Sequence, residues 1–247
     1  ARYYIFMIAS SHDGNLLLPP LDRDRIRLPP GFGTRFMLFV DTEEEFDWDG
    51  PFRRTGHSVT ALEGLARGQA YFQSAGVKPI YVTDYPIVES EKAVALLGQW
   101  RADGSADLGA HLHPWVNPPH LEEVNAANSY VGFLPEAIER AKLDALCNQM
   151  EARFGARPIC YRAGRYGVGP HSARLLEEAG FRLDTSVRSR FDYSEQHGPD
   201  FQGLPQCPYW AAPGRSLIEL PLSTAFVGLA RGGGEALYRA AHRVRPL

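Results

Sequence analysis

The sequence is short of the features that mark several common protein classes. It has three cysteines among 247 residues, and no two of them stand at C-x-x-C spacing. An odd number without that spacing argues against a disulfide framework or a zinc ribbon, so we interpret them as buried, unreactive thiols. No apolar run approaches the ~18 residues that a membrane-spanning helix needs. We therefore expect no membrane span.

Neither sign of charge dominates the sequence. The formal net charge is -3, with 44% hydrophobic and 22% charged residues, which is the balance of a globular domain. Without a basic excess we expect no nucleic-acid partner. The apolar stretch 3–9 lacks a charged segment before it and a small-residue cleavage site after it, so we interpret it as a strand. This absence of a visible leader favours a cytoplasmic location, with a periplasmic or secreted one left open. The oligomeric state is not readable.

The chain divides into an irregular arm and one larger domain. Residues 1–34 form the expected N-terminal arm, because its second half is rich in proline, glycine, aspartate and arginine. Over 35–247, short apolar segments alternate with helical ones. The expected strands are 36–40, 79–83, 107–110, 158–161, 181–183 and 217–220, and the expected helices are 58–74, 90–101, 135–154 and 170–180. This alternation predicts an α/β fold with a parallel sheet, and about seven strands favour a distorted (β/α) barrel over an open sheet.

Polar residues follow these strands directly. Asp41 and Glu43 come after the first strand, and Arg162 after the fourth. In parallel α/β barrels the active site lies at the carboxyl ends of the strands, so we expect these groups to share one opening. A guanidinium at the end of an apolar strand needs a partner, and Asp41 is the natural one for Arg162.

Two histidines after the third strand predict a metal. His111 and His113 stand at i and i+2, so both point to the same side of an extended chain. With Glu43 nearby they form a set of imidazole and carboxylate ligands that suits Zn²⁺ and leaves a position open for water. Glu44 and most of the acidic run around it are interpreted as a solvated turn, and Asp84 as a helix N-cap or a supporting group.

The order and spacing of these residues resemble the polysaccharide-deacetylase superfamily, the NodB-type carbohydrate esterases, over residues 35–222. Carried over from the family's first motif, Asp41 is the catalytic base and Glu43 a metal ligand. The second motif opens with Gly109-Ala-His111. The family's second histidine normally stands four residues on, where this chain has Trp115, so His113 takes that role by a shift of the loop.

The resemblance assigns further roles. Arg162 would orient the base, the backbone N–H of Tyr166 would bind the oxyanion, and Trp115 and Thr185 would contact substrate. The family's last motif supplies a histidine as catalytic acid, but the matching stretch 218–222 has none. His57, His171 or a group beyond the last residue remain as alternatives, as does the lack of an acid.

The resemblance implies a metal-dependent deacetylase that hydrolyses an N-acetyl or O-acetyl group on a sugar or polysaccharide. It would be a hydrolase of non-peptide carbon–nitrogen bonds with one divalent metal, for which zinc is the leading candidate. Phe46, Trp48 and Trp115 would stack on sugar rings, with core packing as the alternative. Three other functions stay open: a same-fold hydrolase of a non-sugar amide, a non-catalytic sugar-binding relative, and a metal-independent enzyme whose histidines act in acid–base roles.

Overall fold

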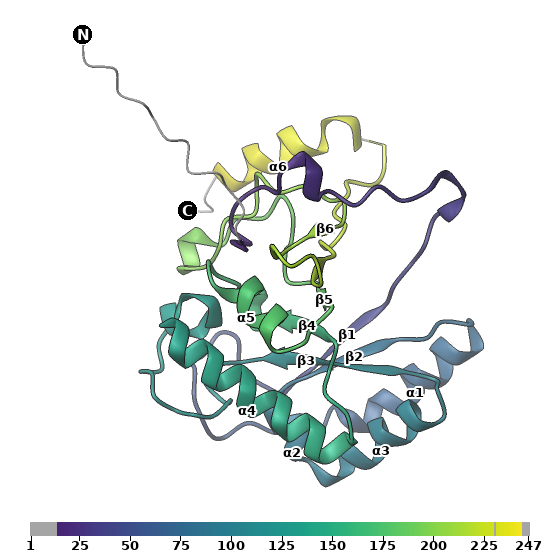
Figure 1. Cartoon of the computed structure of the whole chain (residues 1–247), viewed down its shortest axis with the longest axis vertical. Coiled ribbons are helices and arrows are strands. Elements are labelled where there is room, and N and C mark those ends of the chain that lie inside the picture. The colour runs from purple at the N-terminus through teal and green to yellow at the C-terminus, as the bar shows by residue number, and fades with distance from the viewer. Residues whose placement is uncertain (1–13, 230, 244–247) are drawn as a thin grey trace.

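The computed structural model describes residues 14–229 and 231–243, and it shows a mixed α/β domain (Figure 1). The expected strand at 3–9 lies outside these residues. The strands are β1 (Phe39–Thr42), β2 (Ile80–Thr83), β3 (Asp107–Leu112), β4 (Cys160–Ala163), β5 (Leu183–Asp184), β6 (Tyr209–Trp210) and β7 (Ile218–Glu219). The helices are α1 (Leu62–Ser74), α2 (Tyr85–Glu89), α3 (Glu91–Ala102), α4 (Glu136–Phe154), α5 (Ser172–Glu178) and α6 (Gly234–Arg243).

The strands form one seven-stranded sheet in the order β1-β2-β3-β4-β5-β7-β6. Every neighbouring pair is parallel except β6 and β7, which run antiparallel. The predicted α/β fold with about seven strands is confirmed. Among the described residues β1 and β6 are edge strands that do not pair with each other, so the distorted barrel is open. The sequence did not predict β6, because a two-residue strand carries no periodic pattern.

Two sequence signals explain most of the helix boundaries. Proline opens α4 at its N-cap position, and Gly155 ends this helix in the left-handed conformation, with φ of 75°. A residue with a side chain is strained there, whereas glycine is not. Asp84 caps α2, since its carboxylate accepts a hydrogen bond from the Ile87 backbone N–H at 3.0 Å. That confirms the predicted N-cap, although α2 itself was not predicted.

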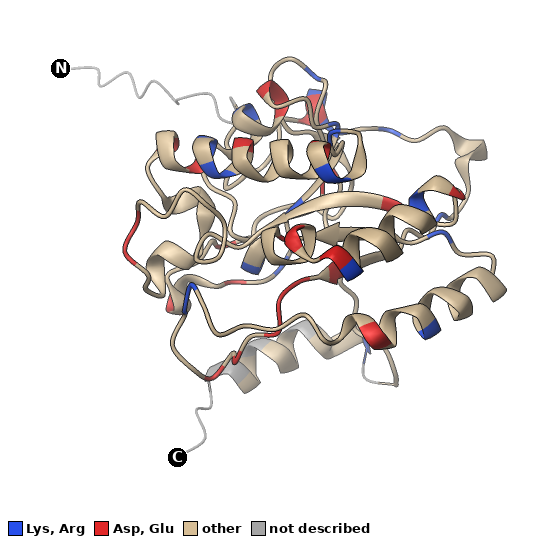
Figure 2. Ribbon diagram, turned by 90° about the horizontal axis from the view of Figure 1, so that it is seen from below, with Lys and Arg blue, Asp and Glu red and all other residues tan. Residues whose placement is uncertain are grey.

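The core lies on the faces of the sheet. β4 is buried along its whole length, as a strand covered on both sides should be. In Figure 1, α3 and α4 lie along β2 and β3, and both helices pack against β3. Figure 2 shows acidic and basic residues interspersed along the helices. In the part of the chain that the structure describes, no helix is both long and apolar enough to span a membrane.

The described part of the N-terminal arm packs on the far end of the sheet. Leu16 is buried in the main apolar cluster, and the Ile26 N–H donates to the Pro208 carbonyl at 2.9 Å, beside β6. Arg25 forms an antiparallel bridge with Tyr209. These contacts show that the arm shares its core with the larger domain. The domain boundary at residue 34 stays a prediction.

Candidate metal centre

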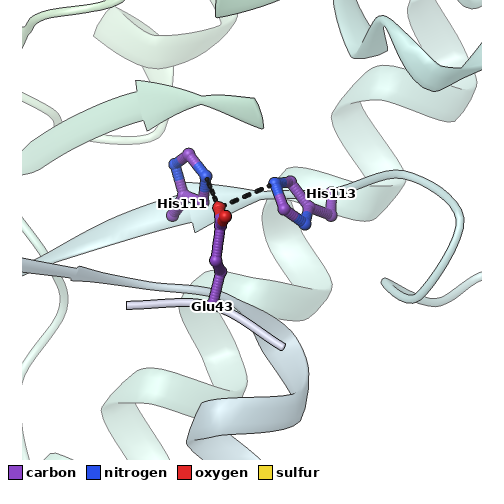
Figure 3. A group of neighbouring side chains, drawn as sticks. All are labelled: Glu43, His111 and His113. Carbon is purple, nitrogen blue, oxygen red and sulfur yellow. Dashed lines mark hydrogen bonds and ion pairs between the residues drawn. The ribbon is translucent and has the colours of Figure 1, made fainter. Parts of the chain in front are cut away.

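The ends of β1 and β3 bring the three predicted metal ligands together (Figure 3). The Glu43 Oε2 atom lies 3.0 Å from His111 Nε2 and 3.2 Å from His113 Nε2. One ligand atom of each residue lies within 4.8 Å of the others. β3 continues to Leu112, so His111 lies inside the strand and His113 follows it. Their i, i+2 spacing therefore points both rings to the same side, as predicted.

The donor set fits a divalent cation. His113 Nε2 is buried and has no hydrogen-bond partner of acceptable geometry in the described structure, although it faces Glu43. An orphaned buried nitrogen is costly unless another group binds it. Two imidazoles and one carboxylate directed at one point suit Zn²⁺, with a further position left for water. The group could therefore hold a metal ion.

Backbone packing fixes the position of His113. A Cβ atom on Gly164 would lie 2.2 Å from His113 Cδ2 and 2.6 Å from the Leu112 carbonyl oxygen, so no side chain fits there. On its other face the His113 ring stacks on Trp115, with ring centroids 4.3 Å apart. The imidazole is held between a glycine backbone and an indole.

Glu44 supports the site and was missed by the sequence interpretation. It was expected in a solvated acidic turn, but it is 3% exposed. Its Oε2 atom lies 2.8 Å from His113 Nδ1, and its Oε1 atom accepts a hydrogen bond from Trp115 Nε1 at 2.8 Å. The Glu44 N–H donates to Asp84 Oδ2 at 2.9 Å. The local sequence of three consecutive glutamates does not show which side chain is buried. The burial of Glu44 depends on partners that follow β2 and β3.

Glu44, Asp84 and His113 form a second group of possible ligands. Both Asp84 oxygens already accept backbone N–H groups, and both Glu44 oxygens are engaged with His113 and Trp115. This arrangement is typical of the outer layer of a metal site, where a carboxylate orients a ligating histidine. The group of Glu43, His111 and His113 is therefore the better candidate for holding a metal ion.

The pKa values of these groups reflect their mutual contacts. Burial alone would raise the pKa of Glu43, but the hydrogen bond with His111 and the close charge of His113 bring it well below its usual range. Burial is likewise outweighed at Glu44, where the His113 charge lowers the pKa to about 2. Burial would lower the pKa of His113, yet Glu44 and Glu43 raise it well above the ordinary value. The carboxylates thus compensate positive charge at this point, whether it comes from an imidazolium or a cation.

Asp41 and Arg162 form the predicted pair beside the ligands. Arg162 Nη1 on β4 lies 2.5 Å from Asp41 Oδ1 on β1, and Arg162 Nε donates to the Thr185 carbonyl at 3.2 Å. The His111 Nδ1 atom lies 3.0 Å from the Arg162 carbonyl oxygen, which ties the pair to the metal ligands. The Asp41 side chain is 34% exposed, whereas that of Arg162 is 6% exposed. Arg162 therefore holds Asp41 in place, while the Asp41 carboxylate stays accessible to an incoming molecule.

The predicted substrate-contacting residues lie at different depths. Trp115 is 2% exposed and packs beneath His113, and Thr185 is also buried and contributes its carbonyl to Arg162. Tyr166 is half-buried and stacks on Tyr193, with ring centroids 5.8 Å apart. Their roles in substrate binding stay predictions. The geometry gives Trp115 and Thr185 supporting contacts.

A cavity of about 370 Å³ lies beside the centre, between β1 and α1. Asp41, Glu43 and Trp48 line it, and the Trp48 side chain is exposed. Trp48 meets Phe46 edge to face at 5.0 Å. The cavity therefore joins the candidate base and a metal ligand to an aromatic wall, as expected for a small-molecule site.

A separate catalytic acid is not evident. His57 is exposed, and His171 lies 3.7 Å from Glu136 on α4. Among the described residues, no histidine other than His111 and His113 forms a hydrogen bond or ion pair with Glu43, Asp41 or Arg162. Glu219, in the stretch where the family places its histidine, is fully buried on β7.

Comparisons with known proteins give distant structural likenesses. No protein-family model matches the chain, and no curated protein matches it. A solved structure from Mycobacterium smegmatis, described as a polysaccharide deacetylase, is 21% identical with a TM-score of 0.47, over 74% of this chain and 59% of that one. Puue allantoinase is 14% identical with a TM-score of 0.44, over 83% and 69% of the two chains.

A third structure, IcaB from Ammonifex degensii, is 12% identical with a TM-score of 0.38, over 69% of this chain and 66% of that one. This chain spans 59% of the length of the Mycobacterium smegmatis protein. At these identities the likeness concerns only the arrangement of strands and helices. The function proposed below is therefore argued from this chain's own residues.

Proposed function

We propose that this chain is a metal-dependent hydrolase that removes an acetyl group from the amide or ester of a sugar or polysaccharide. The observation that carries this proposal is the position of Asp41. Its half-exposed carboxylate is held by Arg162 next to the buried ligand set of Glu43, His111 and His113. A base beside a cation site with an open position is the arrangement that activates water.

Glu43, His111 and His113 would hold the cation, with zinc the best match to their ligand atoms. When bound, a divalent cation supplies Lewis acidity that polarises an acyl oxygen and lowers the pKa of water. Asp41 accepts a proton from the attacking water. Arg162, itself held by the Thr185 carbonyl, fixes the orientation of this carboxylate through the salt bridge. The Tyr166 N–H binds the oxygen on which negative charge develops.

The reaction must also protonate the leaving nitrogen. The proton that Asp41 takes from water is the one available in this centre, because no second histidine acid contacts the described site residues. Asp41 therefore serves first as base and then returns the proton to the amine. Water adds to the acyl carbon, the carbon–nitrogen bond breaks, and acetate and the free amine leave.

The test is deacetylation of N-acetylglucosamine oligomers by the purified chain, with metal content measured on the same samples. Asp41→Asn should retain the metal and lose at least ~100-fold in kcat, the lower range for a general base. His111→Ala should lose both metal and activity. Glu89→Gln, an exposed carboxylate on α2, is the matched control and should change neither. Full activity in Asp41→Asn would refute the assigned base.

A non-catalytic sugar-binding function is the second candidate, and the missing acid histidine is what favours it. It predicts that the chain binds N-acetylated oligosaccharides without releasing acetate, even when metal is supplied. It also predicts that Asp41→Asn leaves the affinity for the oligosaccharide unchanged. The same samples therefore distinguish the two functions.

A further inference from the structure

Two arginines beside Tyr166 have no acidic partner. Arg165 and Arg188 are half-buried, and within residues 14–229 and 231–243 neither forms a salt bridge. Between residues 14 and 229, the other buried or half-buried arginines each pair with a carboxylate: Arg54, Arg140, Arg153, Arg162 and Arg174. A partly desolvated guanidinium without a carboxylate is an available site for an anion.

Neutral groups hold the Arg165 guanidinium in place. Its Nη1 donates to Ser129 Oγ, and its Nη2 donates to Gln196 Oε1 at 2.9 Å. The group lies over the Tyr130 ring at 4.1 Å and over the Phe52 ring at 5.1 Å. Ring faces and amide oxygens orient a guanidinium but do not neutralise it.

Arg188 is held in the same way. Its guanidinium lies 3.6 Å from the Phe191 ring centroid and 5.4 Å from that of Tyr166, and its Nη1 donates to the Tyr193 hydroxyl at 2.8 Å. Tyr193 itself stacks on Tyr166. Both arginines therefore have planar, pre-oriented guanidinium groups whose remaining N–H donors match the two oxygens of a carboxylate.

Both arginines follow strands that neighbour the metal centre in the sheet, Arg165 after β4 and Arg188 after β5. Arg165 follows Gly164, whose backbone lies against His113, and Arg188 comes three residues after Thr185, whose carbonyl binds Arg162. Arg165 and Tyr166 have φ values of 55° and 59°, a left-handed conformation that is strained for a residue with a side chain. Backbone strain of this kind is concentrated at functional sites.

We propose that Arg165 and Arg188, which lie beside Tyr166, bind a carboxylate of the substrate. This inference rests on the proposed deacetylase function and names its substrate class: an acidic glycan whose acetylated sugar stands next to a sugar acid. The two guanidinium groups select substrates by charge, whereas Asp41 and the metal ligands act on the acyl group.

The test uses two oligosaccharides that share N-acetylglucosamine and differ in charge. A hyaluronan tetrasaccharide alternates that sugar with glucuronate, and chitotetraose is neutral. Calorimetry with the zinc-loaded full chain should show hyaluronan binding at least ~10-fold more tightly, the worth of one charge-assisted contact. Arg165→Gln and Arg188→Gln should each weaken hyaluronan binding ~10-fold and leave chitotetraose within ~2-fold. Arg190→Gln, an exposed arginine nearby, is the control for charge removal and should leave both unchanged.

Failure of hyaluronan to bind more tightly than chitotetraose would overturn the inference, as would an equal loss in the Arg190→Gln control. If either glutamine variant does not fold, the wild type decides, because its hyaluronan affinity must fall with added NaCl while its chitotetraose affinity stays constant. Arginine-dependent preference without acetate release would refute the deacetylase and keep the anion site. Acetate release from both oligosaccharides, with no difference in their affinity, would keep the deacetylase function and refute the anion site.

Discussion

The Glu44 carboxylate lies 2.8 Å from His113 Nδ1 and, through its other oxygen, 2.8 Å from Trp115 Nε1. This contact fixes the His113 ring so that Nε2 faces Glu43, and it places the Nδ1 proton on the side away from the metal position. A carboxylate behind a ligating histidine also increases the basicity of the ligand nitrogen. Glu44 thus prepares His113 for metal binding without being a ligand.

The first prediction follows from that contact. Glu44→Gln keeps the volume, but it cannot accept hydrogen bonds from both Trp115 and His113, because one of its two terminal atoms is now a donor. We expect zinc affinity to fall ~10- to 100-fold. Competition against a fluorescent chelator measures this. Glu89→Gln, at an exposed position on α2, is the control. An unchanged affinity in Glu44→Gln would contradict the assigned role.

A glycine controls the other side of His113. Gly164→Ala would place a methyl group 2.2 Å from the His113 ring, and this methyl group would also be too close to the Leu112 carbonyl oxygen. We expect the ring to move, zinc to be lost and the free energy of unfolding to fall by ~1–3 kcal/mol, as for an overpacked core. Gly203→Ala has no atom within 4 Å and serves as the control. Equal zinc content in both variants would show that His113 does not depend on this contact.

The sequence allowed most of the fold to be predicted because its signals are local. The glycine after α4 and the apolar run of β2 mark their elements within a few residues. The strand ends were placed too early, since β3 and β4 run on through His111 and Arg162. In a sequence, a polar residue after an apolar run looks like the end of a strand, because the partner that buries it in the folded chain is not visible.

The same limit applies to the site. The i, i+2 spacing of the histidines predicted the metal ligands, and the need of Arg162 for a partner predicted its pair with Asp41. In each case a local pattern of residue types was sufficient. Glu44 could not be predicted, because its burial depends on Trp115 and His113, about 70 residues away in sequence. Long-range partners of this kind leave no local pattern in the chain.

A buried lysine secures the loop that follows the ligands. Lys142 on α4 is fully buried, and its Nζ donates to the carbonyls of Pro114, Asn117 and Pro119 and lies 2.9 Å from Glu122 Oε2. Lys142→Met would leave the buried Glu122 with only the more distant Arg54, whose Nη2 lies 3.8 Å from Glu122 Oε1. We expect a loss of ~3–5 kcal/mol in the free energy of unfolding.

Chemical denaturation measures this loss, with the exposed Lys92→Met as control. Adding Glu122→Gln to Lys142→Met should restore part of the stability, because it removes a buried charge that has lost its nearer cation. A double variant no more stable than Lys142→Met would show that the loss does not come from that carboxylate.

Glu139 predicts a pH dependence of stability that is separate from the metal centre. Burial raises its pKa from 4.5 to about 7, and one of its oxygens has no hydrogen-bond partner among the described residues. Since the folded state holds this proton more tightly than the unfolded state, the contribution is fully present below pH ~4.5 and is lost as pH rises through about 7.

At 1.36 kcal/mol per pKa unit, this contribution is ~3 kcal/mol. Glu139→Gln keeps the uncharged form at every pH. The difference in unfolding free energy between the variant and the wild type should therefore grow in favour of the variant between pH 5 and pH 8. A constant difference across that range would contradict the raised pKa.

The central claim is that Glu43, His111 and His113 bind one metal ion. Elemental analysis of the purified, untagged chain, beside the His111→Ala/His113→Ala double variant, tests it most directly. We predict ~1 equivalent of zinc or a similar divalent metal in the wild type, as three protein ligands would hold, and its loss in the double variant. Wild-type protein that neither contains nor takes up metal, or a double variant that retains it, would contradict the account.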